Sequence, residues 1–147
     1  MFERLKATAV REAAERIAPH INRTPLRHSP ELSALAGGDV FLKLENHQTT
    51  GSFKLRGALN ALGLLSAPEP QRGVVASSAG NHGLGVARAA KLLGIRAKIY
   101  VPRSAPQVKK DGIEALGAEL DDSQPDYDAA MDVAKAFGAA QGRRYIN

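Results

Sequence analysis

The chain has 147 residues, of which 44% are hydrophobic and 24% charged, so it can form one folded domain. No apolar run approaches the roughly 20 residues of a membrane span, and the N-terminus lacks the continuous apolar stretch of a secretory signal. The absence of cysteine excludes disulfides and thiolate chemistry and fits a cytoplasmic protein. The net charge is +5, but the basic residues are scattered, so we interpret them as a solvated surface and expect no nucleic-acid partner.

The first third of the chain predicts a helix, an extended segment, a short helix and a strand. The apolar residues of the first helix, at helical spacing, are Phe2, Leu5, Val10, Ala13, Ile17 and Ile21. An extended, proline-bearing segment follows at residues 22–26. A short helix at 29–35 ends at Gly37-Gly38, and a strand covers 40–44.

Beyond this point, helix and strand signals alternate. Helices are predicted at 53–65, 81–93, 105–116 and 127–140, and strands at 73–77, 97–101 and 144–146. A further strand at 119–120 is expected to be short or at an edge, because acidic residues follow it, and 68–70 is expected to be an ordinary loop. This alternation predicts an α/β fold: a parallel sheet, with strands 73–77 and 97–101 adjacent, between helices on both faces in three layers.

Lys54 stands in the first turn of a predicted helix, directly after a Thr/Gly/Ser turn. A helix N-terminus carries partial positive charge, which disfavours a cationic side chain and favours the neutral amine. A lysine that forms a Schiff base must be neutral to attack a carbonyl, so this position suits that chemistry. A lysine that simply reaches into solvent is the plainer alternative.

Residues 77–83 join a predicted buried strand to the next helix. Such a turn presents backbone N–H groups at a helix N-terminus, where an anion can bind, and it lies at the carboxyl end of a parallel strand. Asn81 offers both a donor and an acceptor, which suits a phenolic oxygen or a carboxylate. A plain turn in which Asn81 caps the helix is the alternative.

Together, QTTGSFKLRGA at 48–58 and SSAGNHG at 77–83 resemble the pyridoxal-phosphate lyases and isomerases of the tryptophan-synthase-β fold type. Within that group they are similar to threonine/serine dehydratases and serine racemases, from residues 24–26 through to 145–147. The resemblance implies a two-domain fold type II enzyme with pyridoxal 5'-phosphate as cofactor. It also implies an amino-acid substrate and a homo-oligomer for the full-length protein.

The resemblance also implies roles for individual residues. Lys54 would hold the cofactor and then move the α-proton, Phe53 would pack against the pyridine ring, and Asn81 would bond the ring hydroxyl oxygen. The substrate carboxylate would be received by a turn made of Ser78, Ala79, Gly80, Asn81 and His82, with the His82 imidazole secondary. The implied reaction converts threonine or serine to the 2-oxo acid and ammonia.

Two positions favour a dehydratase within this family. Leu55 follows the lysine where cysteine synthases and threonine synthases usually carry aspartate. Ala79 stands where serine racemases carry a serine, and a methyl group cannot supply the acid that racemisation needs. We therefore expect β-elimination, with a racemase-like isomerase as the alternative.

Other features receive plainer interpretations. Gly80, Gly83 and Gly85 follow the order G-x-x-G-x-G rather than that of a dinucleotide-binding turn, although Arg103 could meet a 2′-phosphate in that alternative. No metal site is expected, because His20, His28 and His47 lack ligand spacing. Arg56 is expected in a structural ion pair. A solvated loop is expected to contain Asp121, Asp122, Asp126 and Asp128, which lack the glycine and glutamate of a calcium loop.

The family also needs a glycine-rich loop for the cofactor phosphate, and residues after Gly117 contain no glycine cluster. We therefore expect a truncated chain or the product of a split or decayed gene, with a non-catalytic fragment as a further alternative. Residues 1–45 are expected to pack on a missing large domain, and 46–147 to form the small domain that carries the cofactor lysine. Without the large domain, exposed apolar side chains are expected at Leu5, Val10 and Ile17.

Overall fold

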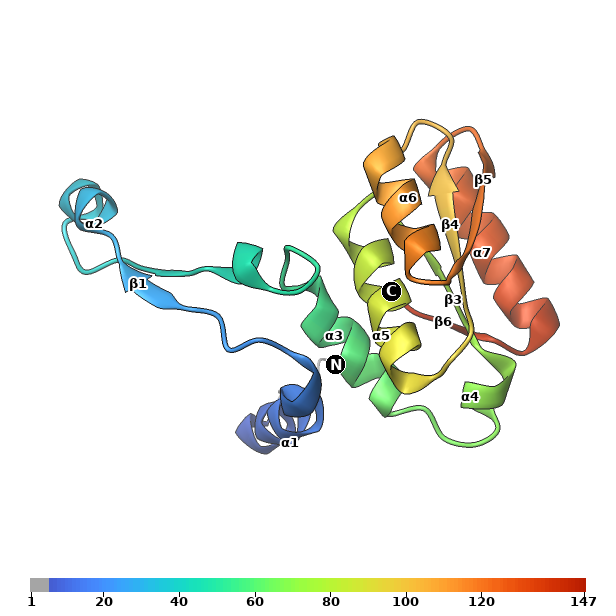
Figure 1. Cartoon of the computed structure of the whole chain (residues 1–147), viewed down its shortest axis with the longest axis horizontal. Helices are drawn as coiled ribbons and strands as arrows, with labels where there is room; N and C mark the ends of the chain where they lie inside the picture. Colours follow the sequence, from blue (N-terminus) through green and yellow to red (C-terminus); the bar gives the residue numbers. More distant parts are fainter. Residues whose placement is uncertain (1–5) are drawn as a thin grey trace.

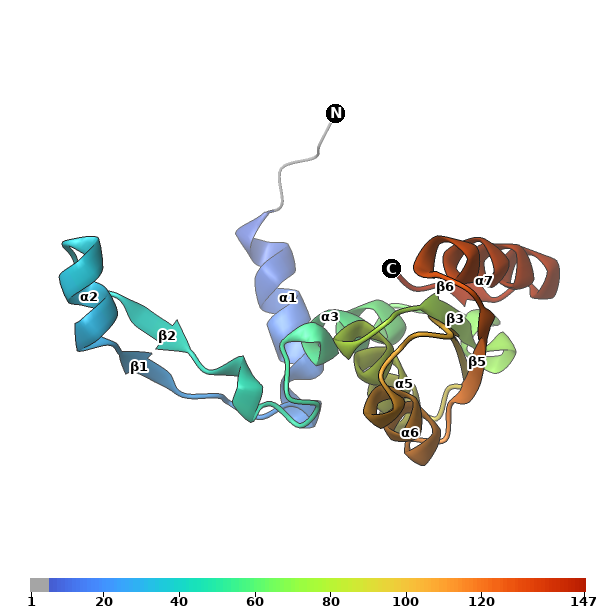
Figure 2. The same cartoon turned by 90° about the horizontal axis from the view of Figure 1, so that it is seen from above.

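The computed structural model describes residues 6–147, which form an α/β body and an arm that extends away from it (Figures 1 and 2). The arm, residues 22–47, contains β1 (Leu26–His28), α2 (Pro30–Ala36) and β2 (Phe41–Lys43). Its two strands pair antiparallel, with Leu26 opposite Lys43. Among residues 6–147, none of the helices combines the length and the apolar character needed to cross a bilayer.

The body is a four-stranded parallel sheet in the order β5-β4-β3-β6. Its elements are α3 (Lys54–Gly63), α4 (Glu69–Arg72), β3 (Val74–Ser77), α5 (Asn81–Leu93), β4 (Ala97–Pro102), α6 (Gln107–Ala115), β5 (Glu119–Gln124), α7 (Tyr127–Gln141) and β6 (Arg144–Tyr145). Helix α7 covers one face of the sheet, while α5 and α6 cover the other (Figure 2). The predicted three-layer fold is confirmed, with β3 and β4 adjacent and parallel.

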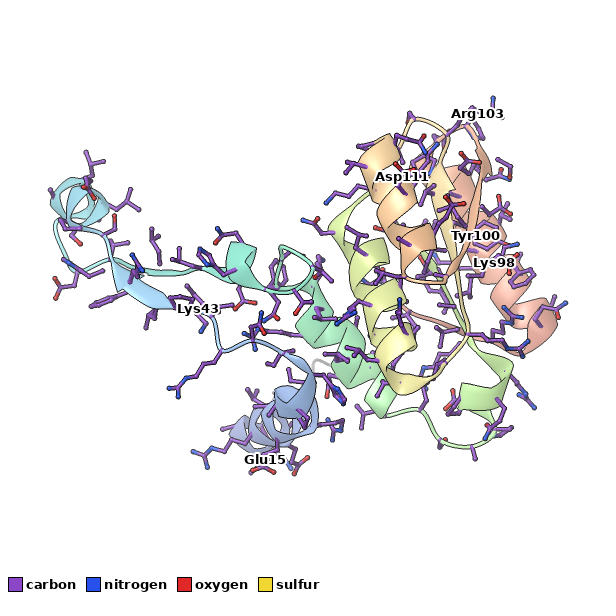
Figure 3. All side chains as sticks on the ribbon, viewed as in Figure 1. Glu15, Lys43, Lys98, Tyr100, Arg103 and Asp111 are labelled. Carbon is purple, nitrogen blue, oxygen red and sulfur yellow. The ribbon has the colours of Figure 1, made fainter. Side chains whose placement is uncertain are left out.

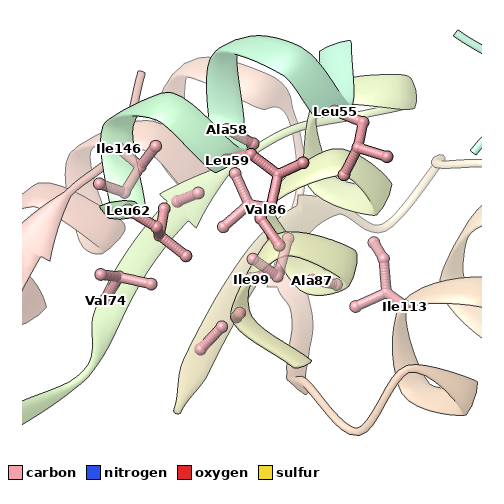
Figure 4. Close-up of a cluster of buried hydrophobic side chains, with 14 of the residues drawn as sticks. Leu55, Ala58, Leu59, Leu62, Val74, Val86, Ala87, Ile99, Ile113 and Ile146 are labelled. Atoms are coloured by element: carbon pink, nitrogen blue, oxygen red, sulfur yellow. The ribbon is translucent and has the colours of Figure 1, made fainter. Parts of the chain in front are cut away.

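Side chains that alternate along β3 supply both cores of the body. Val74 and Ala76 point into the larger core, which α3, α5 and α6 complete around Ile99 (Figure 4). Val75 points to the other face, where Tyr100 and residues of α7 enclose it. Every residue of β3 is buried, as expected for a central parallel strand covered on both faces.

Helix α1 (Ala7–Ile17) packs against α3, which corrects one expectation for the N-terminal segment. The side chain of Ile17 is buried in the larger core and is 7% exposed, because α3 covers it within this chain. Val10 is 59% exposed, as expected. Phe2 and Leu5 lie outside the described residues.

Two expected loops contain regular structure instead. Residues 69–72 form the short helix α4. Pro70 lies in its first turn, where an N–H group would have no partner within the helix, so the missing N–H of proline costs nothing. Asp121 and Asp122 lie in β5 rather than in a loop, because the backbone here pairs with β4, and each of the two carboxylates faces a lysine. The Lys98 Nζ lies 3.5 Å from Asp121, and the Lys110 Nζ donates to Asp122 at 2.8 Å. β5 is an edge strand, as predicted.

Lys98, which faces the acidic residues of β5, also contacts aromatic rings. The Lys98 Nζ lies 5.1 Å from the centroid of Tyr100 and 5.0 Å from that of Phe137. Lys98 and Tyr100 lie close together on β4 (Figure 3). The pKa of Lys98 is raised, chiefly by its hydrogen bond to Glu119, so this lysine stays cationic and holds the edge of the sheet.

Helices α3 and α5 approach each other closely at Gly85. A Cβ atom at this position would lie 3.1 Å from the carbonyl carbon of Lys54 and 3.2 Å from the nitrogen of Leu55. Both obstacles are backbone atoms, which cannot rotate away as a flexible side chain can. Glycine at 85 therefore sets how closely the first turn of α3 packs on α5.

We predict that Gly85→Ala destabilises the fold by roughly 1–3 kcal/mol, because the extra methyl group must push the two helix backbones apart. Gly57→Ala in α3 is the matched control. A Cβ at Gly57 meets no atom within 4 Å, and alanine has the higher helix propensity. The measurement is the denaturant midpoint of each variant. Equal stability of Gly85→Ala and the unmodified chain would contradict the argument.

Candidate active site

An open cleft of about 570 Å³ brings the two sequence motifs together. Its lining residues are Phe53, Lys54, Arg56, Gly57, Ala58, Ser77, Ser78, Ala79, His82, Tyr127, Ile146 and Asn147. The lining combines the start of α3, the turn between β3 and α5, and the start of α7. Lys54 and part of the turn after β3 therefore face one cleft.

Lys54 is exposed at the first position of α3, and Phe53 precedes it as the N-cap. The turn before them is closed by a hydrogen bond from the Gly51 N–H to the Gln48 carbonyl at 2.7 Å. Gly51 has φ of 69°, a left-handed conformation that glycine adopts without strain. The Lys54 Nζ lies 5.3 Å from the centroid of the Phe53 ring, which is itself 59% exposed. An amine and an aromatic face are thus presented together at the cleft.

Hydrogen bonds within the fold fix the turn between β3 and α5. The Ser78 N–H donates to the Tyr100 carbonyl at 2.9 Å, and the Gly80 N–H donates to the Ser78 hydroxyl at 3.1 Å. Ala79, between them, is exposed at the cleft. At the N-cap of α5, Gly80 makes no side-chain capping bond, so the first turn of α5 can offer its N–H groups to an anion.

Asn81 lies beside the cleft rather than on its lining, as does Gly80. The Asn81 Oδ1 accepts a hydrogen bond from the Lys109 Nζ of α6 at 2.7 Å. A lysine can bond only the oxygen of this amide, so the Nδ2 donors of Asn81 remain free of that contact. Three of the five residues of the predicted turn therefore line the cleft, namely Ser78, Ala79 and His82, and Asn81 has a partner that the sequence did not reveal.

Three further residues complete the cleft without having been predicted. Tyr127 follows Asp126, whose Oδ1 accepts the Ala129 N–H and caps α7. That cap lies after β5, so the rule that ligands bind at the carboxyl ends of parallel strands could have pointed to Tyr127. Ile146 and Asn147 reach the cleft through the pairing of β6 with β3. No local motif marks these two residues.

Arg56 lines the cleft and ties α3 to the arm. Its Nε and Nη2 donate to the two oxygens of Glu45 at 2.9 and 2.8 Å, which confirms the expected structural ion pair. The Thr24 hydroxyl donates to the same carboxylate. The hydrogen bond from Arg56 lowers the pKa of Glu45 to about 2. Glu45 is therefore ionised wherever this pair forms.

Two of the three glycines of the rival dinucleotide interpretation, Gly83 and Gly85, serve helix packing. A Cβ at Gly83 would lie 3.1 Å from the Ile113 side chain and 3.2 Å from that of Ile99. Gly85 meets the backbone of Lys54, as described above. The Arg103 Nη2 donates to the Ser123 carbonyl at 2.9 Å. The spacing of Gly83 and Gly85 thus follows from the packing of α5.

The chain is thus an α/β domain whose ligand-binding cleft lies at the carboxyl end of a parallel sheet and contains a lysine. Comparison identifies the family, since residues 17–147 match the model described as pyridoxal-phosphate dependent enzyme. The chain is 50% identical over 112 residues to the catabolic L-threonine dehydratase TdcB of Staphylococcus aureus, covering 76% of this chain and 32% of that protein. The L-threonine ammonia-lyase of Thermotoga maritima is 46% identical over 137 residues, with 88% and 33% covered.

Among solved structures, maize serine racemase superimposes with a TM-score of 0.90 at 36% identity, over 99% of this chain and 44% of that one. The chain belongs to the family of pyridoxal-phosphate-dependent enzymes, and its fold is that of fold type II members. It spans about a third of the length of the curated relatives that it matches. The dinucleotide-binding interpretation is therefore wrong, and the cofactor of this family is pyridoxal phosphate.

The residues of the cleft fit this cofactor. Among residues 6–147, the Lys54 Nζ makes no hydrogen bond or ion pair and lies over the Phe53 ring, so its amine can condense with an aldehyde. Gly57, Ala58 and Ala79 leave room for a flat ring near the exposed face of Phe53. An amine, an aromatic face and small neighbours are the features that a pyridoxal ring requires.

We predict that Glu45→Gln destabilises the chain near neutral pH by roughly 1–3 kcal/mol, because Arg56 loses a charged partner. The pKa of Glu45 falls from 4.5 to about 2 on folding, so the stabilisation is fully present above pH 4.5. It is lost as the pH falls towards 2. Unfolding free energies measured from pH 7 down to pH 3 should therefore converge for the two proteins. A constant difference across this range would contradict the assigned pair.

Proposed function

We propose that the protein carrying this chain is a pyridoxal-phosphate-dependent dehydratase that converts L-threonine or L-serine to the 2-oxo acid and ammonia. The observation that supports it most is the single cleft shared by the free Lys54 amine and the turn after β3. When bound, pyridoxal phosphate supplies the electron sink that lets the Cα–H bond of an amino acid break.

In this proposal the protein positions groups and moves a proton. The Lys54 Nζ would hold the cofactor and, once released from it, would take the α-proton of the substrate. Phe53 would pack against the cofactor ring, and the Nδ2 of Asn81 would supply a donor for the ring hydroxyl oxygen. The substrate carboxylate would be received by the turn of Ser78, Ala79, Gly80, Asn81 and His82. It would bind N–H groups other than those of Ser78 and Gly80, which already donate within the fold.

The choice of dehydration over racemisation rests on Ala79. This residue is exposed at the cleft within the proposed carboxylate turn, and its methyl group cannot donate a proton to the second face of the substrate. The higher identity to the S. aureus and T. maritima threonine enzymes supports the same choice. A racemase-like activity is the second candidate, favoured by the similarity to maize serine racemase.

We further propose that residues 1–45 pack on a second, larger domain, while residues 46–147 form the small domain. The arm supports this, because its apolar side chains are exposed: Leu26 is 63%, Leu35 85% and Phe41 56% exposed. Apolar side chains grouped on one short arm are typical of a surface that packs against another part of a protein.

We predict that Lys54→Ala lowers dehydratase turnover by roughly 10³-fold or more, because the variant lacks both the amine that holds the cofactor and the base that takes the α-proton. Release of 2-oxo acid from threonine and serine, coupled to its reduction, is the measurement. Lys91→Ala, at an exposed site on α5 away from the cleft, is the control. Unchanged turnover in Lys54→Ala would refute the proposal, and D-serine formed from L-serine in place of 2-oxo acid would favour the racemase.

A further inference from the structure

The short segment after α7 contacts both ends of the proposed carboxylate turn. At the start of the turn, the Ser77 Oγ and the Tyr145 Oη lie 2.6 Å apart. At its end, the His82 Nε2 lies 3.2 Å from the Ile146 carbonyl oxygen. The Ile146 N–H donates to the Val75 carbonyl at 2.8 Å, which continues the pairing of β6 with β3. Residues 77–82 are thus held at two points by two consecutive residues.

The contact of His82 fixes the state of one ring nitrogen. A backbone carbonyl can only accept a hydrogen bond, so Nε2 must carry the proton that is shared with Ile146. Ile146 is a firm anchor, because its side chain is 4% exposed and lies beside Leu62 in the larger core (Figure 4). The imidazole in the first turn of α5 is thereby tied to the core.

The contact of Ser77 satisfies a buried hydroxyl. Ser77 is 3% exposed at the carboxyl end of β3, and an unpaired hydroxyl there would be costly. Tyr145 supplies the partner, and its ring lies 5.8 Å from the Lys135 Nζ of α7. The phenol is therefore held between the strand and the helix that covers it.

We propose that His82 and Tyr145 are positioning residues that hold the turn at 78–80 in the shape that receives the substrate carboxylate, His82 through Ile146 and Tyr145 through Ser77. This inference rests on the proposed function of the same turn. A preorganised turn binds the carboxylate without first losing conformational entropy. Neither side chain needs to touch the reacting atoms.

The test compares His82→Ala with His82→Gln in the cofactor-loaded protein. Glutamine can place an amide N–H where the imidazole Nε2–H lies, whereas alanine cannot. We expect His82→Ala to weaken binding of L-alanine, an amino acid without a β-hydroxyl, by roughly fivefold to tenfold, the effect of one hydrogen bond. The readout is the shift of cofactor absorbance on titration with L-alanine. His82→Gln should restore most of the affinity.

A second variant and a kinetic split separate positioning from a merely structural role. Tyr145→Phe keeps the ring but removes the hydroxyl that pairs with Ser77, so it should shift L-alanine binding in the same direction. In His82→Ala and Tyr145→Phe the KM for threonine should rise with little change in kcat, because the turn binds the carboxylate equally before and during reaction, whereas in His82→Gln the KM should stay near that of the unmodified protein. Cofactor loading and the unfolding midpoint should change little.

Three results would overturn the inference. They are unchanged affinity in His82→Ala, failure of His82→Gln to restore it, and loss of cofactor together with unfolding in both His82→Ala and Tyr145→Phe. Failure of the proposed function is a separate result. In that case the unmodified protein would release no 2-oxo acid from threonine or serine, whatever the affinities of the variants for L-alanine.

Discussion

The close packing of α5 against the backbone of Lys54 is the constraint on which the cleft depends. Glycine at position 85 removes the side chain that would separate the two helices, so the turn after β3 and the start of α3 open onto the same space. The Arg56–Glu45 ion pair then ties that first turn of α3 to the arm. Helix packing and one partly buried ion pair thus place an amine beside the turn at 78–82.

Much of the body could be predicted from the sequence because its signals are local. Buried runs such as Val74–Ser77 and helix ends such as Gly94, in the left-handed conformation, mark the elements directly. The predictions that were wrong concern residues whose burial or secondary structure depends on tertiary contacts. Ile17 is buried because α3 lies over it, and Asp122 lies in a strand because β5 pairs with β4. Neither partner is close in sequence.

The residues of the candidate site likewise fall into those that local motifs predicted and those that only the folded structure brings together. Phe53, Lys54 and the turn at 78–80 lie in two motifs, and the rule for parallel sheets brings strand ends to one edge. Tyr145 and Ile146 reach the site through strand pairing, and Lys109 reaches Asn81 from another helix. These contacts arise only once the elements have packed together, so local sequence patterns could not predict them. They show which neighbours hold the residues of the two motifs in place.

The central proposal is that the Lys54 amine is the group that carries the cofactor. The most direct measurement is to load the purified protein that carries this chain with an equimolar amount of pyridoxal phosphate, reduce it with borohydride and map the modified peptide by mass spectrometry. Reduction fixes the pyridoxyl group to the amine that held it. We predict a single dominant modification on Lys54. Modification spread over other lysines, with Lys54 unmodified, would contradict it.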